Sequence, residues 1–201
     1  MEHAANKRPK IENDSVGEFA AWCATEGARF SRLRFVHSES FGNHMVAADE
    51  ISGRTAIVTL PRKFLMSTSN AVSSPTAGEA LRRLVKQWGD LEGGLPLGLR
   101  SQTACDRFCV LALLCHEAAK GENSWWAPYI RLLPPPKTVP ALVQMTPEQL
   151  KESGLLGTIL GAQVEAVWEE VAAQVGLMQR LHGLDAVAFP AEATASFSLF
   201  C

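Results

Sequence analysis

The chain has 201 residues, of which 47% are hydrophobic and 20% are charged, proportions that are typical of a soluble globular protein. Its formal net charge of -2 argues against a nucleic-acid partner, because neutralising phosphates requires a dense surface of lysine and arginine. No apolar stretch is long enough to span a membrane, so no membrane partner is expected. The five cysteines include no CxxC pair, and the first residues lack an apolar secretory signal, so we expect a cytoplasmic or nuclear protein.

The chain begins with a polar arm followed by a helix. Residues 1–14 are polar, charged and without periodicity, which predicts disorder. Ser15 is a predicted N-cap with Glu18 three residues later, and Gly27 is expected to close the helix.

Short strands are predicted after this helix. The segments 33–36 and 55–60 are rich in apolar and β-branched residues. Gly42-Asn43 and Ser52-Gly53 are predicted to supply the turns between them. We therefore expect residues 15–75 to hold a leading helix and a small β meander.

Everything after this segment is predicted to be mainly helical. The sequence Thr146-Pro147-Glu148-Gln149 is a strong helix start, and Pro134-Pro135-Pro136 with Pro140 predicts a rigid connection. The other predicted helices cover residues 76–88, 103–120 and about 158–182. The fold class that follows is α+β, with strands first and then a helical block over residues 76–188.

Cys105, Cys109 and His116 suggest a metal site at first sight. On a helix, however, Cys105 and His116 would be about 16 Å apart along the axis, too far to share one ion. We therefore expect no metal here and interpret these cysteines as buried core residues. A cysteine–histidine nucleophile pair stays open, because such partners meet in space rather than in sequence.

Other sequence motifs that mark common catalytic or nucleotide-binding sites are absent. Glu165, Glu169 and Glu170 have the spacing of a solvated helix face rather than of a catalytic carboxylate pair. The chain contains no GxGxxG, GxxxxGK[ST] or HExxH motif, so phosphate loops and zinc protease chemistry have no support.

The run Ser124-Trp125-Trp126-Ala127-Pro128-Tyr129 holds two of the five tryptophans and the only tyrosine. Tryptophan and tyrosine each need a buried slot and a hydrogen-bond partner, so this run is interpreted first as a packing anchor.

This tryptophan run also resembles the SET-domain protein methyltransferases of the Rubisco large-subunit lysine methyltransferase type. Further matches follow in the same order as in that family and span roughly residues 15 to 200. They are Phe19 and Trp22, Gly42, Val46-Ala47, Ile51, Gly53, Leu60-Pro61, Leu111 to Glu117, Gly121, Leu155-Leu156-Gly157-Thr158, Phe189-Pro190, Thr194 and Phe197.

The resemblance implies short N-terminal SET strands and a mainly helical inserted subdomain, with residues 189–201 returning toward a SET core whose C-terminal part is missing. It implies S-adenosylmethionine as cofactor, a protein substrate methylated on lysine or histidine, and Phe41, Gly42 and His44 at the cofactor edge. His44 stands where the family has a second glycine, and a side chain there can obstruct the ligand. The family's later arginine, Asn-His segment and catalytic tyrosine have no counterparts in these residues, so no catalytic residue is assigned.

Two function classes are therefore expected. The first is a shortened methyltransferase that is inactive alone and contributes the first cofactor-facing strands. The alternative is a non-catalytic protein-interaction module built on the helical insert, with a protein partner and no nucleic acid. A helical scaffold with an accidental resemblance is a third reading.

Overall fold

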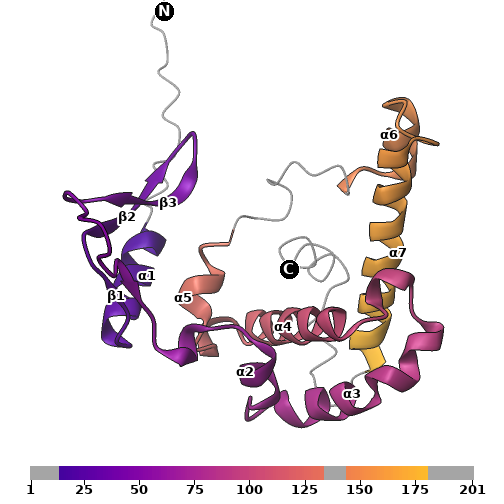
Figure 1. The fold of residues 1–201 in the computed structure, drawn as a ribbon, viewed down its shortest axis with the longest axis horizontal. Coiled ribbons are helices and arrows are strands. Elements are labelled where there is room, and N and C mark those ends of the chain that lie inside the picture. The colour runs from indigo at the N-terminus through magenta and orange to yellow at the C-terminus, as the bar shows by residue number, and fades with distance from the viewer. Residues whose placement is uncertain (1–13, 134–143, 181–201) are drawn as a thin grey trace, which may run out of the picture. The chain divides into compact units, whose positions relative to one another are not determined.

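The computed structural model describes residues 14–133 and 144–180 (Figure 1). The chain divides into two compact units. Unit 1 comprises residues up to 61 together with 128–132, and unit 2 comprises residues 62–127 and those from 133 onward. Of the predicted disordered arm 1–14, residues 1–13 lie outside the described residues and Asp14 begins the first helix. The proline-rich connection and the segment 189–201 also lie outside the described residues.

Unit 1 contains one helix and two small antiparallel sheets. The strands pair as β1 with β4 and β2 with β3, the second pair running in register from Leu33 opposite Ala47 to Ser38 opposite Gly42. The elements are α1 (Asp14–Thr25), β1 (Arg29–Phe30), β2 (Leu33–Ser38), β3 (Gly42–Ala47) and β4 (Val58–Thr59).

The end of α1 follows a local sequence signal, whereas the predicted N-cap at Ser15 is wrong because this residue lies inside the helix. The helix begins one residue before the predicted cap. Gly27 adopts φ +89°, and the Ala28 N–H donates to the Cys23 carbonyl at 2.8 Å, which is the pattern of a left-handed helix C-terminus. The prediction that Gly27 closes this helix is confirmed.

Two strand predictions were wrong in detail. The predicted strand at 55–60 is reduced to β4, which has two residues. The predicted Gly42-Asn43 turn is the beginning of β3, and the hairpin loop is residues 39–41 instead. The reason is that Gly42, at φ +62°, ends the loop and lets Asn43 pair directly opposite His37.

An aromatic cluster holds α1 against the β2–β3 hairpin within unit 1. The Phe19 ring lies edge-on to the Phe35 ring at 5.2 Å, and Phe30 contacts Phe35 at 4.7 Å between ring centroids. Tyr129 lies 6.5 Å from Phe19, and Arg131 forms an ion pair with Glu18 at 3.0 Å. Residues 128–132 therefore pack with unit 1 through both apolar and charged contacts.

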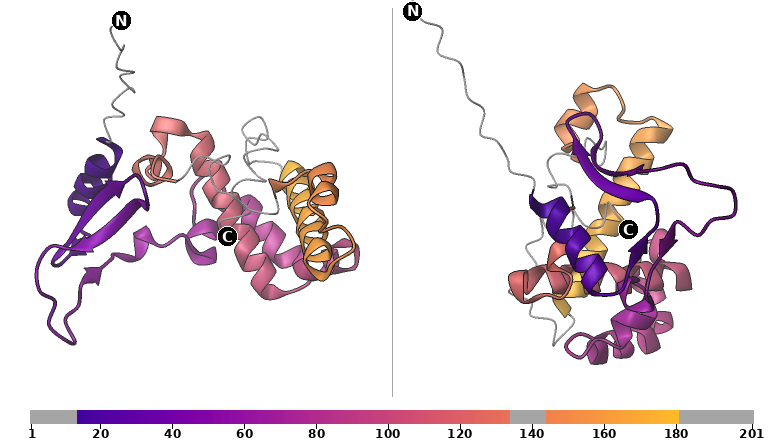
Figure 2. Two further views of the ribbon diagram at one scale, coloured as in Figure 1. Left: turned by 90° about the horizontal axis from the view of Figure 1, so that it is seen from above. Right: turned by 90° about the vertical axis from the view of Figure 1, so that its left-hand side faces the viewer.

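All the regular elements in the described part of unit 2 are helices, coloured from purple through magenta and orange to yellow in Figure 2. A short helix, α5 (Ala127–Ile130), spans the sequence boundary between the two units. The other elements are η1 (Arg62–Phe64), α2 (Thr68–Val72), α3 (Gly78–Leu91), η2 (Glu92–Gly94), η3 (Leu97–Leu99), α4 (Gln102–Ala119), η4 (Gly121–Asn123), α6 (Pro147–Glu152) and α7 (Ile159–Arg180).

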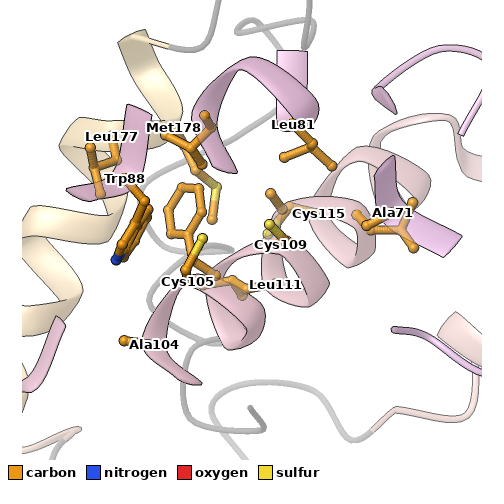
Figure 3. Packing of buried hydrophobic residues seen from close by; sticks show 14 of the residues in the cluster. Ala71, Leu81, Trp88, Ala104, Cys105, Cys109, Leu111, Cys115, Leu177 and Met178 are labelled. Carbon is orange, nitrogen blue, oxygen red and sulfur yellow. The ribbon is translucent and has the colours of Figure 1, made fainter. Parts of the chain in front are cut away.

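The core of unit 2 surrounds α4. Phe108 from this helix is fully buried and lies 5.7 Å from the Trp88 ring of α3. Leu177 and Met178 of α7 complete the cluster (Figure 3). Eleven of the 18 residues of α4 are buried, seven of them consecutively from Leu111 to Glu117, which explains why this part of its sequence is nearly continuous apolar residues rather than an amphipathic stripe.

Several helix predictions are confirmed. Thr146 forms a capping box with Gln149 at the start of α6, where Pro147 occupies the first turn. The predicted helices over 76–88, 103–120 and 158–182 correspond to α3, α4 and α7, although α7 is described only to Arg180. The α+β class is also confirmed. None of the helices in the described part of the chain combines the length and apolarity needed to cross a membrane.

Candidate functional site

The three predicted cofactor-edge residues lie together at the tip of the β2–β3 hairpin. Gly42 ends the loop at φ +62°, a conformation that a side chain makes costly. No atom lies within 4 Å of the position where a Cβ would project from Gly42, so the surrounding space is open. The Phe41 N–H donates to the Ser38 hydroxyl at 3.1 Å and tightens the loop.

Phe41 and His44 form an aromatic pair beside this glycine. Their ring centroids are 5.9 Å apart with the planes tilted by 67°. His44 Nδ1 donates to the Gly42 carbonyl at 3.0 Å, which fixes the imidazole close to the loop backbone. The Phe41 side chain is 81% exposed and contributes to no core, which is unusual for a phenylalanine.

On the opposite face of the hairpin, a second hydrogen-bond chain supports the same strands. Asn43 Oδ1 accepts from His37 Nδ1 at 2.8 Å, and Asn43 Nδ2 donates to the Leu132 carbonyl at 3.2 Å. Asn43 therefore joins both strands to residues 128–132. Its role is structural.

The hairpin tip can offer a ligand an exposed ring, an imidazole and a turn free of Cβ. The described groove of unit 1 lies along α1 and β2, and none of Phe41, Gly42 or His44 lines it. The tip is thus suited to contact one side of a ligand, not to enclose one.

Cys105 and Cys109 are core residues, as predicted. Cys105 and Cys109 are fully buried, and each forms part of the α4 core. Burial raises the pKa of the Cys109 thiol to about 12 and that of Cys23 to about 11, and it also raises the pKa of Cys105. These thiols are protonated at neutral pH, which makes them poor nucleophiles and poor metal ligands. Among the described residues, no group of three potential ligands is close enough to hold a metal ion.

The described surroundings of His116 and of the α7 glutamates also indicate no catalytic arrangement. His116 is buried near the end of α4, and its Nε2 lies 2.7 Å from the hydroxyl of the exposed Thr76. Glu165 and Glu169 are exposed, as predicted. Glu170 differs, because it is half-buried and its carboxylate lies in the space that a Cβ on Gly98 would occupy.

A buried polar network that sequence reasoning missed anchors the tryptophan run. Glu117 accepts from Lys120 Nζ at 2.6 Å and from the Ser124 hydroxyl at 2.7 Å. The Ser124 hydroxyl in turn accepts from the Trp126 N–H at 3.0 Å. Glu117, Ser124 and Trp126 are all at least nine-tenths buried, so the packing interpretation of this run is confirmed.

Trp125 of the same run contacts η1 within unit 2. Its ring lies 5.3 Å from Phe64 and 5.0 Å from Trp126, and Lys63 Nζ lies 5.6 Å from its centroid.

No protein-family model and no curated protein matches this chain.

Proposed function

We propose that this chain holds the first cofactor-facing strands and the helical insert of a SET-domain protein methyltransferase of the Rubisco large-subunit lysine methyltransferase type, with no catalytic centre among these 201 residues. One observation carries the proposal. It is the series of matching residues, in the family's order, from Phe19 to Phe197, with the tryptophan run at its centre.

The hairpin geometry is compatible with this proposal. The residue that the resemblance aligns with the family's first cofactor glycine, Gly42, is held at φ +62° with open space beside it. Phe41 and His44 flank it, and their rings offer flat surfaces for an adenine or a sulfonium cation. S-Adenosylmethionine would contact these three residues and supply the methyl group.

Catalysis requires more than this edge. Methyl transfer needs the donor methyl and a deprotonated amine held in line at near-attack distance. The only tyrosine, Tyr129, packs 6.5 Å from Phe19 in unit 1 and belongs to the tryptophan run, so it is not the family's catalytic tyrosine. We therefore expect no methyl transfer to protein by this polypeptide with labelled S-adenosylmethionine. Clear single-turnover transfer would contradict the proposal.

Cofactor contact is tested by equilibrium dialysis of the full chain with labelled S-adenosylmethionine. Gly42→Val adds a branched side chain at a positive φ in the hairpin tip, whereas Gly53→Val adds the same side chain in an open loop of the same unit. We expect Gly42→Val to weaken binding by about tenfold or more and Gly53→Val to leave it within about twofold. Equal affinities of the two variants for S-adenosylmethionine would show that Gly42 does not lie at the cofactor edge.

The alternative function, a protein-interaction module, is favoured by one surface of unit 2. Leu156, Ile159 and Leu160 are between 41% and 84% exposed around the start of α7. Adjacent exposed apolar side chains of this kind mark interaction surfaces in soluble proteins. Ile159→Asp should then abolish capture of a protein partner while Ala162→Asp on the same helix should not, and recovery of no partner by the unmodified chain would argue against this function.

A further inference from the structure

A groove of about 630 Å³ lies in unit 1 beside the β2–β3 hairpin. Its volume is within the range of ligand clefts. One wall is made by five consecutive residues, 33–37, which is nearly the whole of β2. Since side chains alternate across a strand, consecutive lining residues mean that the groove runs along the strand's backbone edge rather than over one face.

That backbone edge is open. The Ala48 N–H donates to the Arg32 carbonyl at 2.8 Å, and Leu33 lies opposite Ala47. Hydrogen-bonded pairs alternate along an antiparallel ladder, so Arg34, Val36 and Ser38 are the residues bonded to β3. The backbone N–H and C=O groups of Leu33, Phe35 and His37 point to the other side, where no strand of the described chain pairs with β2.

The facing wall leaves room for another backbone. It is formed by α1, whose lining residues are Val16, Gly17, Ala20 and Ala24. These positions repeat at helical spacing and have small side chains, so they form one low stripe along the helix. A strand bound to the edge of β2 could therefore turn alternate side chains toward this stripe.

The charged residues that line the groove determine which kind of segment can bind there. Arg34 and His37 line it, and no acidic residue does. Arg34 is exposed and forms no ion pair with a described residue. An antiparallel pairing of β2 with β2 of a second copy would place two Arg34 side chains on one face without a counter-charge, which is unfavourable.

We propose that this groove binds an extended acidic segment of a partner protein, which adds as a third strand to the edge of β2. In the bound strand, small apolar side chains would face Gly17, Ala20 and Ala24, and the alternate side chains, aspartate or glutamate, would face Arg34. Main-chain hydrogen bonds to Leu33, Phe35 and His37 supply affinity, and the alternation supplies specificity. This inference does not depend on the proposed methyl-donor site.

The test uses the full chain and a blocked octapeptide of alternating valine and glutamate, with an alternating valine–lysine peptide as comparator. Binding is followed by amide chemical shifts. We expect shifts centred on Leu33, Phe35 and His37, and an affinity for the glutamate peptide at least about tenfold above that for the lysine peptide at low salt. Arg34→Glu should reverse this preference.

A matched pair of variants separates the groove from the rest of α1. Ala24→Leu fills the groove, whereas Ala21→Leu changes an exposed residue of the same helix that does not line it. Both substitutions keep helix propensity nearly constant. We expect Ala24→Leu to weaken binding at least about tenfold and Ala21→Leu to change it less than about twofold.

Three results would overturn the proposal. The first is the absence of amide shifts along β2 at millimolar peptide, and the second is equal binding by the Ala24→Leu and Ala21→Leu variants. The third is a dimer of the unmodified chain in sedimentation that Ala24→Leu dissociates, because this would make a second copy the occupant.

Discussion

Removal of the Ser124 hydroxyl is expected to destabilise unit 2 more than any other single-oxygen deletion among the contacts described above. This hydroxyl donates to Glu117 at 2.7 Å and accepts from the Trp126 N–H at 3.0 Å. The residues involved are 5% to 9% exposed, so water cannot readily replace the lost atom. In Ser124→Ala, the Glu117 carboxylate loses one hydrogen bond, and the buried Trp126 N–H loses its bond to the hydroxyl.

The magnitude follows from these two losses. A hydrogen bond to a charged group contributes about 1.5–3 kcal/mol, and an unsatisfied buried donor costs about 1–3 kcal/mol. Because Lys120 still neutralises Glu117 at 2.6 Å, the combined cost should be about 2–4 kcal/mol. Ser153→Ala is the control, since Ser153 is exposed and donates only to the Leu150 carbonyl, and it should cost less than about 0.5 kcal/mol.

The assay is urea unfolding followed by tryptophan fluorescence and far-ultraviolet circular dichroism. A double-mutant cycle with Glu117→Gln isolates the contact, because Ser124→Ala should cost about 1 kcal/mol less when the carboxylate is absent. A loss below about 0.5 kcal/mol for Ser124→Ala, or strict additivity with Glu117→Gln, would refute the reasoning.

Three further predictions concern glycines and thiols. Gly78→Ala should destabilise unit 2 by at least about 1 kcal/mol, because the new Cβ would lie 2.5 Å from the Val72 carbonyl oxygen. The control Gly89→Ala, in the same helix, places a Cβ with nothing within 4 Å and should stabilise unit 2 by about 0.5–1 kcal/mol. If urea unfolding gave the opposite sign for both variants, the described packing at the α2–α3 junction would be wrong. Gly42→Ala should cost about 1–2 kcal/mol through its φ of +62° alone, and thermal unfolding indistinguishable from the unmodified chain would mean that the hairpin loop has another conformation. The Cys109 thiol, with its pKa raised to about 12 by burial, should resist alkylation at pH 8 until urea unfolds the chain, and rapid modification located there by mass spectrometry would contradict its burial.

Sequence reasoning succeeded where the signal is local. The start of α6 was predictable because Thr146, Pro147 and Gln149 form a capping box without help from the rest of the chain. The burial of α4 was equally predictable, since a helix that is apolar on most sides must lie in a core.

Sequence reasoning failed where the local structure depends on strand pairing or on tertiary packing. Gly42-Asn43 has the composition of a turn, yet Asn43 lies in β3 because its side chain bonds to His37 across the strand pair. The short helix α2 was not predicted, because its five residues are too few to show a period and its cap at Ser67 is a weak signal.

The candidate site shows the same division. The expectation that Phe41, Gly42 and His44 share a cofactor edge came from the family resemblance, and their proximity in the hairpin follows from their being neighbours in sequence. The groove could not be predicted, since it depends on α1 lying across from the edge of β2. The only sequence signal for it is the helical spacing of Gly17, Ala20 and Ala24, which becomes meaningful once the strand edge is known.

The central claim is that the hairpin tip is the edge of a methyl-donor site, and ultraviolet crosslinking of labelled S-adenosylmethionine to the full chain tests it most directly. Trypsin releases residues 35–54 as one peptide, because no lysine or arginine lies between Arg34 and Arg54. The proposal predicts label on this peptide, reduced by unlabelled S-adenosylhomocysteine and lost in Gly42→Val. Label confined to a peptide of unit 2, or no competable label on any peptide, would contradict it.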